Sequence, residues 1–194
     1  MSNNTSLKIE LPDLLRALPT ASINLTTRRL IDWQLHTMVR PSEAAGTRWC
    51  EIDWDHRLWN IPAERMKKKR PHTVPLTDQT IQILERMQPI SGNREYVFTS
   101  HRNPTSHTHP STTNVAIKRL GYKGKLVAHG LRSKASTTLN EYEFNPDVIE
   151  AALAHIDPNA TRRAYNRAEY IEQRRAMMEW WSTHIDEASR PGTV

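Results

Sequence analysis

Residues 128–155 read AHGLRSKASTTLNEYEFNPDVIEAALAH, and this stretch predicts two consecutive helices. The first is expected from about Gly130 to Asn140. The second is expected from Pro146 to Ala154, because proline suits the first turn of a helix and Asn145 before it is a favourable N-cap residue. Helical sequence therefore dominates this part of the chain.

The rest of the chain is also mostly helical in pattern, with one short region of strand-like sequence. Apolar residues recur at helical spacing on both sides of β-like runs that flank the turn Asp55-His56-Arg57. A mainly α fold with a small antiparallel β-sheet, of the α+β class, is therefore predicted. Its other helices are expected at 10–18, 26–38, 41–47, 77–88 (with Thr77 as N-cap), 112–120 and 161–185 (in two pieces), and its strands at 50–54, 58–61, 72–74 and 96–98.

Length and composition limit the classes of protein to consider. With 194 residues the chain is long enough for one domain with a hydrophobic core and short for two. No apolar run approaches the roughly 18 residues of a membrane helix, and the first residues lack a signal-peptide core. The lone Cys50 excludes an internal disulfide and is expected to be a small buried side chain. We therefore expect a cytoplasmic protein with no membrane partner.

The charge of the chain favours a polyanionic partner. The formal net charge is +6, and arginine outnumbers lysine. Guanidinium groups suit phosphate recognition, because they offer a planar fork of hydrogen-bond donors. Nucleic acid is therefore a candidate partner.

Five separated places supply what metal-free cleavage of a phosphodiester needs. Such a reaction needs a nucleophile, cations on the non-bridging oxygens, a base for the nucleophile and an acid for the leaving alkoxide. Taken singly, each candidate has an ordinary structural explanation, such as a helix cap, a solvated turn or a half-buried tyrosine. Together they occur in the order Arg40, Lys67, His129 with Arg132, His155 and Tyr165.

This order, Arg, Lys, His-x-x-Arg, His, Tyr, resembles the active site of the tyrosine recombinases, in particular the prophage integrases. The similarity extends over nearly the whole chain, from LPDLLRAL to RRAMMEWWSTHID. It implies the catalytic-domain fold of that family and site-specific DNA recombination through a 3′-phosphotyrosyl intermediate. It also implies that neither a metal ion nor any other cofactor is needed.

The resemblance implies a role for each residue at the phosphate. Arg40 and Arg132 would clamp the scissile phosphate, and His155 would hydrogen-bond to it. Tyr165 would attack phosphorus as the nucleophile, and Glu43 would orient Arg40 as a supporting residue. Of these, the nucleophile has a rival in Tyr170, because the step from His155 is one residue longer than in many family members.

The resemblance also implies the two proton transfers. His129 would accept the proton of the tyrosine, and Lys67 would protonate the departing 5′-oxygen. Lys68 and Lys69 stand beside that lysine in the same basic turn and are alternatives to it, although the spacing to Val74-Pro75 favours Lys67.

The resemblance further implies the partners and the domain. The substrate would be double-stranded DNA at attachment sites, bound by other integrase protomers in a tetrameric recombining complex at the nucleoid of a bacterial host. Residues 1–194 would form a single catalytic domain with a flexible tail at 186–194, without the core-binding and arm-binding domains that integrases normally carry.

Other functions and other interpretations of single features stay open from the sequence. A DNA-binding module without catalysis and a type IB topoisomerase are the alternatives, and a metal-dependent nuclease is a distant third. The loop with His101, His107 and His109 lacks the acidic or cysteine ligands that a zinc site would need. The stripe of Ile171, Met178, Trp181 and Ile185 fits a helix face that packs in the core, or, together with Trp180, a contact with a neighbouring protomer.

Overall fold

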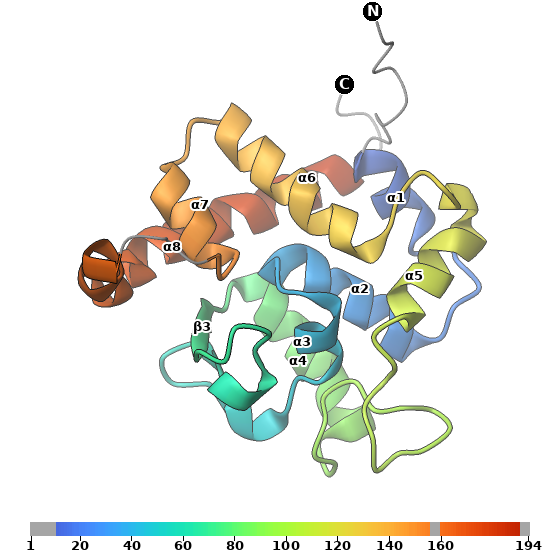
Figure 1. The fold of residues 1–194 in the computed structure, drawn as a ribbon. Coiled ribbons are helices and arrows are strands. Elements are labelled where there is room, and N and C mark those ends of the chain that lie inside the picture. The colour runs from blue at the N-terminus through green and yellow to red at the C-terminus, as the bar shows by residue number, and fades with distance from the viewer. Residues whose placement is uncertain (1–10, 156–159, 191–194) are drawn as a thin grey trace, which may run out of the picture.

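The structure is a computed structural model that describes residues 11–155 and 160–190, without the side chains of 160–169. In these residues helices predominate beside one small sheet (Figure 1), so the predicted α+β class is confirmed. The helices are α1 (Leu11–Ala17), α2 (Leu25–Thr37), α3 (Pro41–Ala45), α4 (Asp78–Ser91), α5 (Thr112–Ile117), α6 (Ala128–Glu141), α7 (Pro146–Ala152) and α8 (Ala160–Ser189). The strands are β1 (Ile52–Asp53), β2 (Leu58–Ile61) and β3 (His72–Pro75).

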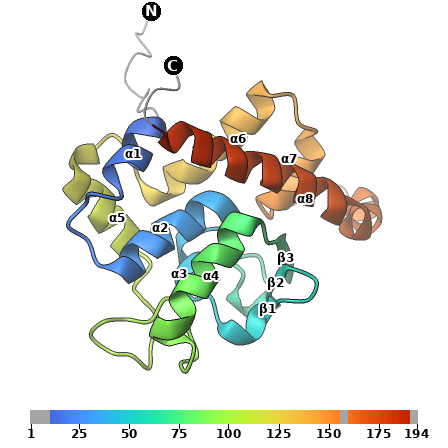
Figure 2. The same cartoon turned by 180° about the vertical axis from the view of Figure 1, so that it is seen from behind.

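Two helices organise the rest of the fold. Helix α2 lies at the centre and contacts α3, α4, α5, α6 and α8. Helix α8 runs across one side of the molecule, from α1 past α2 to α7 and β3 (Figure 2). The three strands form an antiparallel meander in the order β1-β2-β3, with Ile61 opposite His72. Helix α6 contacts both α2 and α7, and α8 contacts both α7 and β3, so these elements lie next to one another.

The hydrophobic core ties the sheet to the central helix. Trp33 on α2 and Trp59 on β2 are fully buried, with ring centroids 5.1 Å apart, and Phe98 lies 6.0 Å from Trp33. Tilted aromatic pairs of this kind add about 0.5–1.5 kcal/mol beyond the burial of their area. Trp181 on α8 is also fully buried and donates its ring N–H to the carbonyl of Leu35 at 2.8 Å. The core interpretation of the α8 stripe is thus confirmed for Trp181.

Side-chain capping marks the starts of α4 and α7. The side chain of Thr77 accepts a hydrogen bond from the Thr80 amide at the start of α4, as predicted. Asn145 accepts one from the Asp147 amide at the start of α7.

Helix α5 ends earlier than predicted, at Ile117, and a π-helical turn follows in which Gly121 has φ 92°, a conformation that favours glycine.

Two predicted strands differ from the structure. The strand expected at 50–54 is reduced to Ile52–Asp53, because the Glu51 carboxylate accepts the Arg48 amide and closes a 3-10 turn there. Cys50 in this turn is exposed, so the prediction of a buried cysteine was wrong. The strand expected at 96–98 is an isolated bridge between Tyr96 and Arg48.

Helix α8 also differs from its prediction. It is one element, where the sequence predicted two pieces. Residues 186–189, where the sequence led us to expect a tail, form its last turn, and Asp186 accepts a hydrogen bond from Gln79 at 2.8 Å. No helix in the described part of the chain is both long and apolar enough to span a membrane.

Candidate active site

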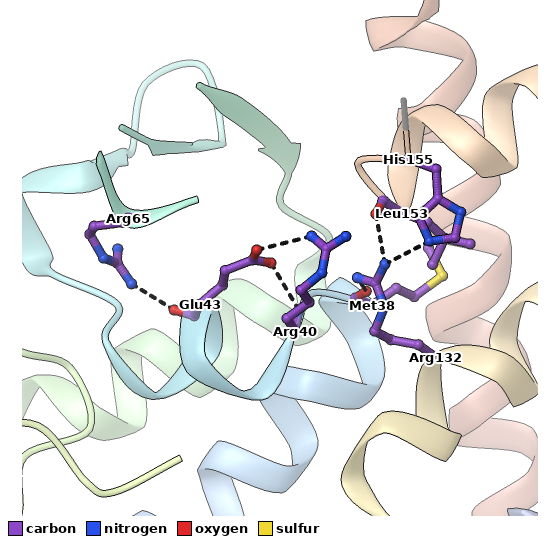
Figure 3. Close-up of polar contacts among 7 residues, drawn as sticks. All are labelled: Met38, Arg40, Glu43, Arg65, Arg132, Leu153 and His155. Carbon is purple, nitrogen blue, oxygen red and sulfur yellow. Dashed lines mark hydrogen bonds and ion pairs between the residues drawn. The ribbon is translucent and has the colours of Figure 1, made fainter. Parts of the chain in front are cut away.

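Arg132 joins the ends of two helices. It lies in α6, is 4% exposed, and donates to the carbonyl of Met38 at 2.5 Å and to that of Leu153 at 2.7 Å (Figure 3). Met38 is the C-cap of α2 and Leu153 is the C-cap of α7. The last carbonyls of a helix lack partners within the helix, and a cation near them is favourable. Arg132 therefore holds the two helix ends together.

This capping also places two other candidate residues. Arg40 follows the cap of α2 by two residues, and His155 follows the cap of α7 by two. The Nη2 atom of Arg132 lies 3.4 Å from Nε2 of His155. Burial, and then the positive charge of Arg40, lower the pKa of Arg132 to about 10, so it remains a cation at neutral pH. The structure thus brings Arg40, Arg132 and His155 to one place.

Arg40 is held by Glu43, the contact that the sequence led us to expect. Arg40 is the N-cap of α3, and Glu43 accepts its backbone amide and its guanidinium, each at 3.0 Å. The Glu43 side chain is 1% exposed, whereas that of Arg40 is 15% exposed. The carboxylate therefore lies behind the arginine, and the arginine retains an open side.

Arg65 supports the pair of Arg40 and Glu43 from the 3-10 turn that follows β2. Sequence reasoning missed this residue. Arg65 donates to the backbone carbonyl of Glu43 at 2.7 Å and forms an ion pair with Glu51. It passes close to Gly46, where an added Cβ would lie 2.9 Å from its Nη2 atom. No local sequence signal marks this contact, because β1 and β2 both lie between the partners in the sequence.

His155 projects from a strained turn. Its amide donates to the Glu150 carbonyl at 3.0 Å and the Ala154 amide donates to that of Ala151 at 3.1 Å, which closes the end of α7. Ala154 has φ 50°, in the left-handed region. The Nδ1 atom of His155 lies 2.7 Å from a Glu150 carboxylate oxygen. With its proton on Nδ1, the ring presents Nε2 towards Arg132.

The pKa of His129 is affected by four other candidate residues. His129 is exposed at the start of α6, one turn before Arg132. Burial lowers its pKa first, followed by the positive charges of Arg132, Arg40, His155 and Lys67. Coulombic effects fall with distance, so these four groups all lie around His129. Five of the residues predicted from the sequence are therefore close enough to influence one another, and the lowered pKa of His129 favours its neutral form.

Two of the three lysines of the basic turn differ in their surroundings. Lys67, Lys68 and Lys69 are all exposed between Met66 and β3. The charge of Lys67 reaches His129, whereas the ammonium of Lys69 donates to the carbonyl of Glu64 at 3.1 Å. The effect of its charge on His129 favours Lys67 over Lys69 as the lysine of the site.

The two candidate nucleophiles, Tyr165 and Tyr170, differ in what the structure describes of them. Tyr165 lies in α8, and its side chain is outside the described residues. Tyr170 is half-buried and packs against the hydrophobic core. A packed ring is the ordinary structural role, so the rival to Tyr165 has another explanation.

Two of the three loop histidines have local hydrogen-bond partners, and His101 is exposed. His107 donates from Nδ1 to the Thr108 carbonyl at 2.8 Å, and Nδ1 of His109 lies 2.7 Å from the Ser111 hydroxyl. Among the described residues, no group of three or more His, Cys, Asp or Glu side chains could hold a metal ion.

Known proteins resemble this chain in sequence and in fold. The phage integrase family matches residues 7–172. Prophage integrase IntA of Escherichia coli K12 is 55% identical over 95% of the chain, which covers 45% of IntA. The recombinase XerH bound to a palindromic difH substrate has a TM-score of 0.63 at 18% identity, over 90% of this chain and 52% of XerH. The catalytic core of lambda integrase has a TM-score of 0.60 at 16% identity, over 79% of this chain and 93% of that core.

Proposed function

Because this chain belongs to the phage integrase family, we propose that it is the catalytic domain of a tyrosine-type site-specific recombinase. In this proposal residues 1–194 cut and rejoin DNA during prophage integration. The chain spans less than half of IntA and nearly all of the lambda catalytic core, which supports a single catalytic domain. The observation that carries the proposal is the gathering of Arg40, Lys67, Arg132 and His155 around His129.

The first step of the proposed reaction is attack on phosphorus. The Tyr165 oxygen forms a bond to the scissile phosphorus as the bond to the 5′-oxygen breaks. Arg40 and Arg132 stabilise the charge that grows on the non-bridging oxygens, because cations fixed in a partly buried site need little reorganisation. His155 adds a hydrogen bond to the same phosphate, and Glu43 keeps Arg40 in place.

The two proton transfers complete the step. His129 accepts the proton of the Tyr165 hydroxyl, a role that suits a histidine whose pKa is lowered by burial and by the cations near it. Lys67 gives a proton to the departing 5′-oxygen. The phosphotyrosine bond conserves the energy of the broken ester, so a 5′-hydroxyl from another strand can reverse the step and rejoin DNA.

The proposed substrate and partners follow from the same chemistry. XerH is a relative in fold that is bound to its DNA substrate, and the net charge of this chain is +6. We propose double-stranded attachment sites as the substrate, bound by four protomers in the recombining complex. Such a complex would act in the bacterial cytoplasm, on the nucleoid.

A nicked suicide duplex of the attachment site tests this function. Once cleaved, such a duplex loses the short strand that would reverse the reaction, so a covalent protein–DNA adduct accumulates on a denaturing gel. The adduct is expected with the wild-type chain and not with Tyr165→Phe, which loses one hydroxyl. DNA binding without an adduct would instead indicate a binding module, and relaxation of any supercoiled plasmid would indicate a topoisomerase. An adduct that persists in Tyr165→Phe and is lost in Tyr170→Phe would move the nucleophile to Tyr170.

A further inference from the structure

The end of α7 is contacted by side chains from three other elements. Arg174 of α8 donates to the carbonyl of Ala151 at 3.4 Å, and Arg132 of α6 donates to that of Leu153 at 2.7 Å. Between them, His72 of β3 contacts the backbone of Ala152. Three consecutive residues, 151 to 153, are therefore each bound by a different element, directly before the turn that carries His155.

Arg174 reaches a second element as well. Its Nη2 atom donates to the carbonyl of Thr73 at 2.6 Å, on the strand that follows the Lys67 turn. One side chain of α8 thus binds both β3 and the end of α7. These contacts join positions 101 and 23 residues away in the sequence.

Burying the charge of Arg174 costs desolvation free energy that a purely structural contact would not require. Arg174 is 8% exposed, burial lowers its pKa to about 10, and its Nε atom is buried without a hydrogen-bond partner in the described structure. Both described acceptors are neutral carbonyls, which compensate a buried charge less well than a carboxylate does. An apolar side chain of similar length would fill the same space without that desolvation cost. The two carbonyl contacts are therefore the feature that an arginine supplies here.

We propose that Arg174 is a positioning residue for strand cleavage, fixing α8 against β3 and the end of α7 so that Tyr165 meets the phosphate site. The inference rests on the proposed function. Tyr165 lies about two and a half turns earlier in the same helix, so a small rotation or shift of α8 moves the nucleophile relative to His155 and Arg132. Misplacement of a reacting group by about 1 Å can slow a reaction by about 100-fold.

The test compares Arg174→Met with Arg174→Lys and with the neighbouring control Arg175→Met. Methionine keeps the length and apolar stem but removes the donors, and lysine keeps the charge and can donate to a carbonyl. Arg175 is a matched control, because it also lies on α8 and its polar partners, the His56 carbonyl and Glu172, are not at the end of α7. The readouts are the adduct rate on the suicide duplex at saturating protein and the Kd for the uncleaved duplex.

The expected result separates rate from affinity. Arg174→Met should slow adduct formation by about 10- to 100-fold with the Kd within about twofold of wild type. Arg174→Lys should recover part of that rate, and Arg175→Met should match wild type. Unchanged rates in Arg174→Met, an equal loss in Arg175→Met, or a loss that appears only as weaker binding would each overturn the inference. If Arg174→Met fails to fold, Arg174→Gln takes its place with the same expectations.

A second measurement needs no DNA. In Arg174→Met the amides of Ala154 and His155, which close the end of α7, should exchange with solvent at least about tenfold faster than in wild type. Unchanged exchange would overturn the inference even if the adduct rate fell. An absence of adduct in the wild-type chain with faster exchange in the variant would overturn the proposed function and this role in it. A wild-type adduct with unchanged exchange would overturn only the role of Arg174.

Discussion

Nη2 of Arg132 lies 3.4 Å from Nε2 of His155, and both groups depend on the same helix end. Arg132 donates to the carbonyl of Leu153, and His155 follows that residue by two positions. The same arginine also caps α2 through Met38, two residues before Arg40. Helix capping and assembly of the site are therefore one set of contacts, so changes at these helix ends should alter stability and cleavage together.

Ala154→Gly should stabilise the chain. Ala154 has φ 50°, and the left-handed conformation costs a residue with a Cβ roughly 1–2 kcal/mol. Glycine removes that cost and loses about 0.4–1 kcal/mol through greater freedom of the unfolded chain. We expect the free energy of unfolding to rise by about 0.5–1 kcal/mol in urea titrations. Ala151→Gly, inside α7, is the matched control and should lower it by about 1 kcal/mol. Destabilisation by Ala154→Gly would show that the strain at this turn is absent.

Gly46→Ala should disturb Arg65, which supports Arg40 through Glu43. The new methyl would lie 2.9 Å from Nη2 of Arg65, which binds the carbonyl of Glu43. We expect a loss of about 1–3 kcal/mol in the free energy of unfolding, typical of overpacking, and slower adduct formation. Ser42 is exposed on α3, the helix that Gly46 caps, so Ser42→Ala should change neither the stability nor the rate. Wild-type stability and rate in Gly46→Ala would mean that Arg65 can move away without affecting Arg40.

The sequence predicted those parts of the fold and site that depend on local patterns. Thr77 and Asn145 cap the residues that follow them, so the starts of α4 and α7 were predictable. The helix that carries Arg132 was predicted from about Gly130, whereas α6 begins at Ala128, so it was the structure that placed His129 one helical turn before Arg132. The order of the catalytic residue types then identified the family, which the sequence comparison confirms.

What the sequence could not predict depends on distant partners. Arg174 binds the carbonyl of Thr73, and every residue has a carbonyl, so no residue type marks the acceptor. The same holds for Arg65 and the carbonyl of Glu43. The strand expected around Cys50 was wrong for a related reason, because the Glu51 side chain competes with strand pairing by binding a neighbouring backbone amide.

Acidification should destabilise the chain through two buried histidines. Burial lowers the pKa of His36 to about 4 and that of His72 to about 3. Both pKa values lie below the unfolded value of about 6.5, so the unfolded chain binds more protons and stability falls as the pH drops below 6.5. At pH 5 each histidine should cost about 2 kcal/mol relative to pH 7.5, since both folded pKa values lie below 5.

His36→Asn isolates one of these two contributions. Asparagine keeps a polar group near Ser182, whose hydroxyl lies 2.9 Å from Nδ1 of His36, but does not titrate. The loss of unfolding free energy between pH 7.5 and pH 5, measured in urea, should shrink by about 2 kcal/mol in this variant. The exposed His101→Asn serves as a control and should keep the wild-type pH dependence. An unchanged pH dependence in His36→Asn would mean that His36 is not buried as a neutral ring.

Lys67→Ala should be rescued by a better leaving group. As the general acid, Lys67 would protonate an alkoxide whose conjugate acid has a pKa near that of water, far above neutral pH. Sulfur in place of the 5′-bridging oxygen makes the leaving group a thiolate, whose parent thiol has a pKa of about 8.5 and departs without a proton. Lys67→Ala should therefore be slowed by about 100-fold or more on ordinary DNA and react near the wild-type rate on the sulfur-substituted strand. Lys69→Ala, which loses the bond to the Glu64 carbonyl, should be close to wild type on both. Arg132→Ala should stay slow on both, because the non-bridging oxygens are unchanged. Equal slowing of Lys67→Ala on the two substrates would assign Lys67 to phosphate binding, and the proton would then come from another group.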